Sequence, residues 1–116
     1  MRVANITRGT VVAERVRVAR STRDRTVGLL NRDGLAEDEG LWIERSPSIH
    51  MFFMRFPIDA VFVGADGRVT KVVPALKPWR VVWWARGARD CLELAAGAAV
   101  RSGTRPGDEL RLVDAP

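Results

Sequence analysis

The chain has 116 residues, of which 47% are hydrophobic and 28% are charged, and its formal net charge is +5. A chain of this length buries roughly two thirds of its unfolded surface on folding, so we expect one domain over residues 1–116 with a real core. One cysteine excludes an intramolecular disulfide, and one cysteine with one histidine cannot build the usual zinc sites, so we expect no metal and no cofactor. No apolar run is long enough to span a bilayer and no signal-peptide core opens the chain, so we expect a cytoplasmic protein.

The positive charge is concentrated at the start of the chain. Residues 1–32 hold eight arginines against Glu14 and Asp24, which gives this part a net charge of +6. Such a surface can attract nucleic acid, anionic lipid or an acidic partner. Charge runs are also common on solvated surfaces that bind nothing specific, and we favour that interpretation.

The first third of the chain predicts strands followed by a helix. Val3 to Ile6 and the alternating segment from Thr10 to Arg20 have the period of β-strands. Ser21 followed by Asp24 is typical of a helix start, so the principal helix is expected from Thr22 to Asn31.

Gly28 lies inside this predicted helix, where glycine costs about 1 kcal/mol relative to alanine. This cost indicates that something packs closely at Gly28, and we favour a neighbouring strand over a ligand. A solvated acidic loop over residues 34–40 then leads to a short strand from Leu41 to Ile43.

The stretch from Pro47 to Val63 is the most distinctive part of the sequence. It holds the only histidine, two of the three methionines and three of the four phenylalanines. Both faces of the segment from Ile49 to Met54 are nearly all apolar, which predicts an interior strand or the wall of a pocket. Pro57 cannot donate to a strand ladder, so it should mark the corner before a second strand from Ile58 to Val63.

The second strand should divide its side chains between two faces. One face is expected to carry Ile58, Ala60 and Phe62, and the other Asp59, Val61 and Val63. The Asp66-Gly67 pair then predicts a hairpin turn, after which residues 68–73 return antiparallel to this strand.

Several separated motifs follow one another in a recognisable order. They are Gly28-Leu29-Leu30, Gly40-Leu41, Ser48-Ile49-His50, Phe52-Phe53-Met54-Arg55-Phe56-Pro57-Ile58-Asp59, Asp66-Gly67-Arg68-Val69, Pro78-Trp79-Arg80, Leu92-Glu93-Leu94 and Gly107-Asp108. Over about residues 15–113, this pattern resembles the widespread prokaryotic family DUF192, also called UPF0127. The resemblance implies a compact, mostly β domain and assigns it no biochemical role.

Tryptophans and basic residues are interleaved between residues 74 and 89. Tryptophan between arginines can form a platform on which the bases of a single strand stack. Tryptophan is buried on average, however, so we expect Trp79 and Trp83 to cover the core while the arginines point into solvent. Trp84 follows Trp83 directly and should point to the opposite face, where it is the tryptophan expected to be exposed.

The last quarter of the chain completes the expected fold. Cys91 to Leu94 reads as a strand in which Cys91 and Glu93 face one side, and a short helical turn and a final strand follow over residues 95–101 and 108–113. The fold class is therefore α+β and β-rich, with about seven strands in a rolled or barrel-like, mostly antiparallel sheet and one principal helix.

Catalysis has weak support in the sequence. Cys91 with His50 as its base could form a nucleophilic pair, but Cys91 stands where the family pattern has an apolar residue and is expected to fill the core. His50 and Asp59 are weak candidates for a general acid and base, with Glu93 as a further carboxyl group. A lone histidine in an apolar segment is more often a hydrogen-bonded core residue, so we lean against an enzyme.

The interpretation we favour is a small binding domain. Polar residues within an otherwise apolar segment predict a pocket beside His50, Arg55, Asp59 and Glu93, in which Arg55 would hold the anionic group of a small ligand. The first alternative is a nucleic-acid or polyanion-binding module that uses the arginine-rich start and residues 77–89. The second alternative is an acid/base enzyme that uses His50 and Asp59. A protein partner and any oligomeric state stay open.

Overall fold

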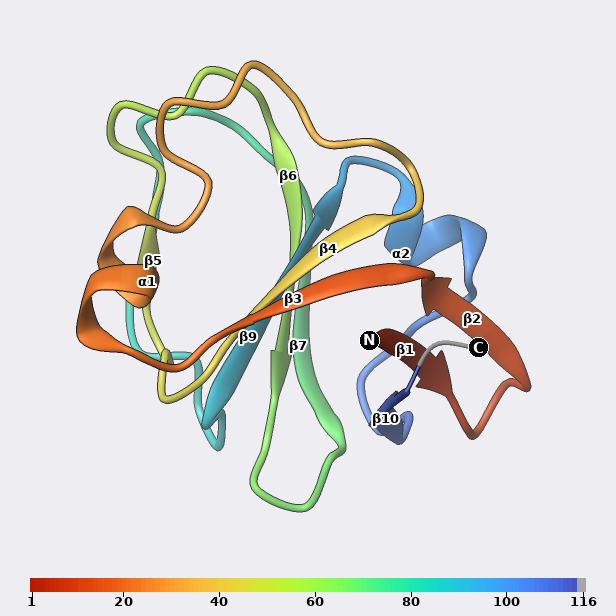
Figure 1. Ribbon diagram of the computed structural model, residues 1–116. Coiled ribbons are helices and arrows are strands. Elements are labelled where there is room, and N and C mark those ends of the chain that lie inside the picture. Colours follow the sequence, from red (N-terminus) through yellow and green to blue (C-terminus); the bar gives the residue numbers. More distant parts are fainter. Residues whose placement is uncertain (115–116) are drawn as a thin grey trace.

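The computed structural model describes residues 1–114, which form ten strands in three sheets and two short helices (Figure 1). The strands are β1 (Arg2–Asn5), β2 (Thr10–Ala13), β3 (Arg15–Ala19), β4 (Glu39–Ile43), β5 (Ile49–His50), β6 (Ile58–Val63), β7 (Val69–Leu76), β8 (Val81–Val82), β9 (Asp90–Ala95) and β10 (Leu110–Val113), and the helices are α1 (Thr22–Val27) and α2 (Ala98–Arg101). The β-rich α+β class is confirmed. Among these residues, no helix has the length and apolar character needed to cross a membrane.

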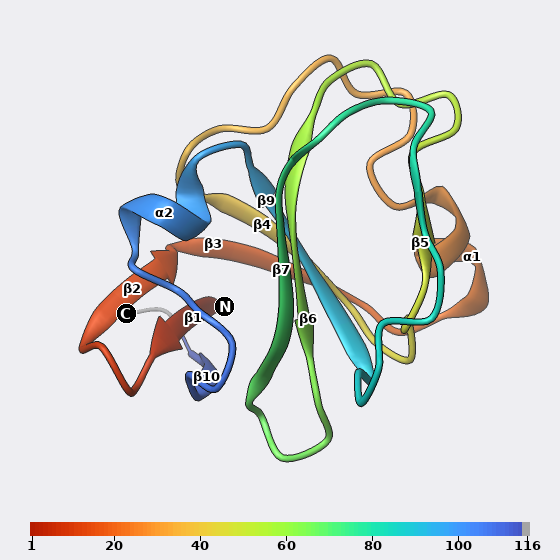
Figure 2. The ribbon, with the colours of Figure 1, turned by 180° about the vertical axis from the view of Figure 1, so that it is seen from behind.

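A five-stranded sheet in the order β3-β4-β9-β6-β7 divides the molecule into two sides. Strands β3 and β4 are parallel and the other pairs are antiparallel. On one side of this sheet lie α1 and the small β5-β8 sheet, and on the other lie α2 and the β10-β1-β2 sheet (Figures 1 and 2). Every residue of the central strands β6 and β9 is buried, because both faces of the sheet are covered.

Two hydrophobic cores lie on the two faces of the central sheet. The first contains Ile58, Ala60, Phe62 and Cys91 together with residues of β4, β5 and the α1 side. The second contains Val61, Val63, Leu92 and Leu94 together with residues of α2 and the small three-stranded sheet. The alternation expected for both strands is confirmed, and Glu93 lies on the Cys91 side while Asp59 lies on the Val61 side.

Helix α1 begins where the sequence predicts. The side chain of Ser21 accepts a hydrogen bond from the backbone N–H of Asp24 at 3.0 Å. The helix ends at Val27, four residues before the expected Asn31, because Gly28 adopts φ 49° and ψ −121° and turns the chain out of the helix.

The expected count of about seven strands was too low, and the sheet does not close into a barrel. The alternating segment 10–20 divides at Glu14 into β2 and β3, which join different sheets. The short β5-β8 pair has too few residues to give a periodic signal. Strands β3 and β7 end the central sheet as edges, so the hairpin of β6 and β7 is confirmed but barrel closure is not.

The exposure of the aromatic side chains differs most from what the sequence predicts. The predicted interior strand from Ile49 to Met54 ends after His50, and Phe52 and Phe53 are exposed while the methionines on either side are buried. Trp79 and Trp83, expected to cover the core, are 58% and 79% exposed. Trp84 is exposed as predicted, and the tryptophan that packs into a core is Trp42 of β4.

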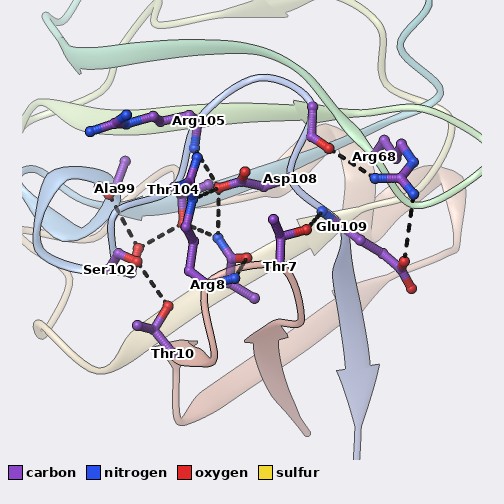
Figure 3. A network of polar contacts seen from close by, with 12 residues as sticks. Thr7, Arg8, Thr10, Arg68, Ala99, Ser102, Thr104, Arg105, Asp108 and Glu109 are labelled. Atoms are coloured by element: carbon purple, nitrogen blue, oxygen red, sulfur yellow. Dashed lines mark hydrogen bonds and ion pairs between the residues drawn. The ribbon is translucent and has the colours of Figure 1, made fainter.

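A buried polar network joins the three-stranded sheet to α2 (Figure 3). At its centre, Asp108 is 2% exposed and accepts hydrogen bonds from Asn5 Nδ2 at 3.0 Å, Arg8 Nε at 3.1 Å and the Arg105 N–H at 3.0 Å. These bonds lower the pKa of Asp108 against the opposing effect of its burial. Ser102 extends the network by donating to the carbonyl of Ala98 at 2.9 Å. Because the Asp108 carboxylate is well supplied with donors, the network holds the fold together and offers little to a ligand.

Candidate functional site

The carboxylate of Asp59 accepts hydrogen bonds from backbone N–H groups of the protein. Asp59 Oδ1 accepts from the Ala75 N–H at 2.8 Å, and Oδ2 accepts from the N–H groups of Gly97 at 3.1 Å and Ala99 at 2.9 Å. Gly97 has no side chain to cap α2, so Asp59 supplies that cap from the neighbouring strand. The side chain is fully buried on the α2 side of the sheet, away from the face that carries Glu93.

Arg55 lies in the exposed loop after β5. Its Nη1 forms an ion pair with Asp33 at 2.9 Å, and both side chains are largely exposed. Of the four residues expected to share a pocket, Arg55 and Asp59 therefore lie elsewhere. His50 and Glu93 are brought together.

A pocket of about 100 Å³ lies on the α1 side of the central sheet. Its polar lining consists of Arg25, Ser46, Ser48, His50 and Glu93, and its apolar lining includes Leu29, Leu30, Ile43, Ile49 and Met54. The walls come from α1 and the turn after it, from β4, from the β5 region and from β9. The pocket thus combines a carboxyl group, a guanidinium group and an imidazole within an apolar surface.

Glu93 is the buried titratable group of this pocket. Its side chain is 6% exposed and lies on β9 opposite Leu41 and Ala60 of the adjacent strands. Burial raises the pKa of Glu93 from 4.5 to about 7. No described side chain donates a hydrogen bond to it or forms an ion pair with it. The carboxyl group therefore changes its charge close to neutral pH and has capacity for a donor from outside the protein.

Arg25 carries the positive charge of the pocket and is a residue that sequence reasoning missed. Its Nη1 reaches the carbonyl of Glu44 at 3.5 Å, and its buried Nε has no acceptor among residues 1–114. A buried guanidinium N–H without an acceptor is costly. Because Arg25 also lines the pocket, its guanidinium group would pair with an anion bound there. The sequence signal for Arg25 was its place one helical turn before Gly28, but the seven other arginines among residues 1–32 made it hard to distinguish.

His50 lies at the exposed end of the pocket lining. Its Nδ1 accepts a hydrogen bond from the Phe52 N–H at 3.3 Å, and its ring stacks on Phe52 with centroids 5.0 Å apart. An Nδ1 that accepts a bond leaves the proton of the neutral ring on Nε2. His50 can therefore present a donor that its local contacts have fixed.

Cys91 lies inside the core, as the sequence predicts. Its thiol is completely buried in the core, and burial raises its pKa well above 9.0. Within residues 1–114, no three His, Cys, Asp or Glu side chains are grouped so that they could hold a metal ion.

The family model DUF192, described as Uncharacterized ACR, matches residues 3–112. The chain belongs to the DUF192 family. The motifs that carried the resemblance, including those around His50 and Glu93, fall inside the matched region.

Two solved structures resemble this DUF192 domain. A protein of unknown function from Novosphingobium aromaticivorans DSM 12444 is 29% identical with a TM-score of 0.84, and the match covers 97% of this chain and 84% of that one. A protein from Sinorhizobium meliloti 1021, described as a "putative transcription regulator", is 26% identical with a TM-score of 0.81 over 95% of this chain and 89% of that one. Among curated proteins, none matches this sequence.

In this DUF192 domain, the backbone at Gly28 lies close to the carboxyl group of Glu93. A Cβ at this position would lie 4.0 Å from Glu93 Oε1 and 3.9 Å from Leu41 Cδ2, so the neighbours are both the predicted strand and the pocket. Because φ is +49°, we expect Gly28→Ala to lower the free energy of unfolding by about 1–2 kcal/mol. Urea titration measures this loss.

Gly103→Ala provides the matched control for Gly28→Ala. Gly103 also has a positive φ, +70°, and nothing lies within 4 Å of the added methyl group, so this variant strains the backbone without touching the pocket. Only Gly28→Ala should change the pH dependence that Glu93 gives to stability. Identical pH profiles for the two variants would argue against the contact.

Proposed function

We propose that this DUF192 domain binds a small organic anion that also carries an amino or hydroxyl group, in the pocket lined by Arg25, His50 and Glu93. The observation that carries the proposal is the coexistence, in one small pocket, of a buried carboxyl group without a described donor and a buried guanidinium N–H without a described acceptor. A ligand with both an anionic group and a donor would satisfy both protein groups at once.

Arg25 would hold the anionic group of the ligand. Guanidinium groups bind carboxylates and phosphates with charge-assisted hydrogen bonds that are stronger than neutral ones. Arg55, the residue first expected in this role, is exposed and already paired with Asp33, so the proposal assigns the anion to Arg25 instead.

Glu93 would accept the hydrogen bond of the ligand's amino or hydroxyl group. Either group would replace some of the hydrogen bonds to water that the carboxylate loses on burial. An ammonium group would in addition favour the ionised form of Glu93 and thereby lower its pKa.

The size of the pocket limits the ligand to a few non-hydrogen atoms inside the protein. A volume of about 100 Å³ is well below the roughly 300–1,000 Å³ of sites for drug-sized molecules and cofactors. Hydroxy acids and amino acids of two or three carbon atoms have the required chemistry and size.

Three probes test the proposal: glycolate, glycine and acetate, titrated at pH 7 and followed by nuclear magnetic resonance. Acetate lacks the donor, so we expect it to bind a few-fold more weakly than glycolate. Arg25→Gln should weaken glycolate binding by about tenfold or more, because it removes a charge-assisted hydrogen bond. Arg23→Gln is the matched control, since Arg23 lies on the same helix, is exposed and does not line the pocket.

A second variant separates the role of the carboxyl group from that of the guanidinium. Glu93→Leu should remove the preference for glycolate over acetate while leaving acetate binding intact. Equal losses in the Arg25 and Arg23 variants, or a glycolate preference that persists without Glu93, would contradict the proposal.

A further inference from the structure

A groove separate from the small-ligand pocket lies between β7 and β8. Its volume is about 510 Å³, and Lys71, Lys77, Arg80 and Trp83 line it together with apolar residues of the two strands. The lining residues come from β7, from β8 and from positions next to these strands. Between the two strands the chain leaves the end of β7 and returns beside β5 (Figure 2). The groove is therefore lined by three cationic side chains and one tryptophan.

The charge of this surface is not neutralised within the protein. Residues 67–89 contain no aspartate or glutamate. Arg68 and Arg89, at the two ends of the segment, form ion pairs with Glu109 and Asp90. The other four cationic residues of the segment form no ion pair among residues 1–114. They are Lys71, Lys77, Arg80 and Arg86. All four are exposed.

The arginines at the start of the chain have a different environment. Five of the eight pair with acidic side chains, in the pairs Arg2–Glu14, Arg8–Asp108, Arg15–Asp38, Arg20–Glu44 and Arg32–Glu39. The excess charge that the sequence places at residues 1–32 is thus largely compensated in the fold. The surface best able to attract a polyanion is the groove.

Three exposed tryptophans lie in the same segment of the chain, and one of them, Trp83, lines the groove. Trp79, Trp83 and Trp84 are 58%, 79% and 77% exposed, although large aromatic residues are usually buried. Trp79 and Trp84 have φ angles of 72° and 48°, which are unfavourable for bulky side chains. Hydrogen bonds hold them there, from the Trp79 N–H to the Met51 carbonyl and from the Trp84 N–H to Ser48 Oγ, both at 2.7 Å. Backbone strain of this kind is typically kept where it serves a function.

We propose that the groove between β7 and β8 binds single-stranded nucleic acid. Lysine and arginine along the groove would contact phosphates, and the exposed indole of Trp83, which lines the groove, would stack on an unpaired base. A single strand fits better than a duplex, whose bases are already stacked on one another. It also fits better than a membrane, because a flat bilayer surface cannot enter a groove whose cations line its walls.

Fluorescence anisotropy with a labelled twelve-residue oligothymidylate tests this proposal. Trp83→Ala should weaken binding by about tenfold, since stacking on one aromatic ring is lost. Lys77→Gln should reduce the slope of log K against log salt by about 0.7, the value for one phosphate contact on a single strand. Arg23→Gln removes the same charge from the exposed helix α1 and should leave the slope nearly unchanged.

Three outcomes would overturn the proposal. They are the absence of oligonucleotide binding at low salt, equal losses in Lys77→Gln and Arg23→Gln, and Trp83-dependent binding to phosphatidylserine vesicles without oligonucleotide binding. The side chains of Arg23, Lys77 and Trp83 are exposed, so these variants should fold, and circular dichroism checks the folding of every variant directly. Arg25→Gln should leave oligonucleotide binding intact, because the small-ligand pocket is on a different part of the surface.

Discussion

Asp59→Ala should lower the free energy of unfolding by about 3–5 kcal/mol, a large part of the stability of a small domain. The carboxylate accepts three backbone N–H groups, those of Ala75, Gly97 and Ala99. Removing it leaves the buried N–H of Ala99 without a partner, at a cost of roughly 1–3 kcal/mol. The N–H groups of the exposed residues Ala75 and Gly97 each lose a hydrogen bond to a charged acceptor, which adds to the loss. Urea-induced unfolding followed by circular dichroism measures the change.

Two further variants define what the loss means. Asp59→Asn keeps one acceptor oxygen, so it should be less destabilising than Asp59→Ala. Asp66→Ala removes an exposed aspartate that also accepts a backbone N–H, that of Arg68 at 3.0 Å, and should cost less than about 1 kcal/mol. If Asp59→Ala were as mild as Asp66→Ala, the assignment of Asp59 to the architecture of the fold would be wrong.

The stability of the wild-type protein should fall by about 3 kcal/mol between pH 4.5 and pH 8 because of Glu93. The pKa of Glu93 is about 7 in the folded protein and 4.5 in its unperturbed state. Below pH 4.5 the group is protonated in both states and its contribution is fully present. As the pH rises, the unfolded chain releases its proton first, and the contribution is lost as the pH passes through the folded pKa.

Glu93→Gln should abolish most of this dependence. Urea titrations at pH 5 and pH 8 measure the free energy of unfolding of both proteins. Between these two pH values, the wild type should lose about 2–3 kcal/mol relative to the variant. Asp108 has a lowered pKa, so its contribution is lost only below 3.8 and does not interfere in this range. The same pH profile in both proteins would mean that Glu93 is not the buried group described here.

Local sequence patterns were sufficient for the hairpin and for the two faces of its first strand. The Asp66-Gly67 turn and the alternation from Ile58 to Val63 depend on neighbours in sequence, and both were predicted correctly. The same is true of the start of α1, where Ser21 and Asp24 form the cap. These features are encoded by side chains a few residues apart.

The candidate site depends on pairings between distant strands, which the sequence does not reveal. Glu93 lies opposite Ala60 and therefore faces α1. Asp59 is the residue before Ala60 on β6, so its side chain points to the other face, toward α2. A shift of one residue in this register would pair Asp59 with Glu93 and place both carboxyls on the same face. For this reason sequence reasoning placed both in one pocket, and for the same reason it did not find Arg25.

The exposure of Trp79 and Trp83 could not be predicted from average burial. Their side chains are directed outward by a loop whose conformation depends on contacts with residues 47–51, such as the bond from the Trp79 N–H to the Met51 carbonyl. Propensity scales contain no information on such long-range contacts.

A map of backbone amide shifts on addition of glycolate to the wild-type protein tests the small-ligand pocket most directly. We predict that the shifting amides belong to residues 25–30, to residues 46–50 and to Glu93, the segments that line the pocket. We also predict that these shifts are lost in Arg25→Gln and retained in Arg23→Gln. Shifts confined to residues 71–86, or no saturable shifts with any of the three probes, would contradict a small-anion site at Arg25 and Glu93.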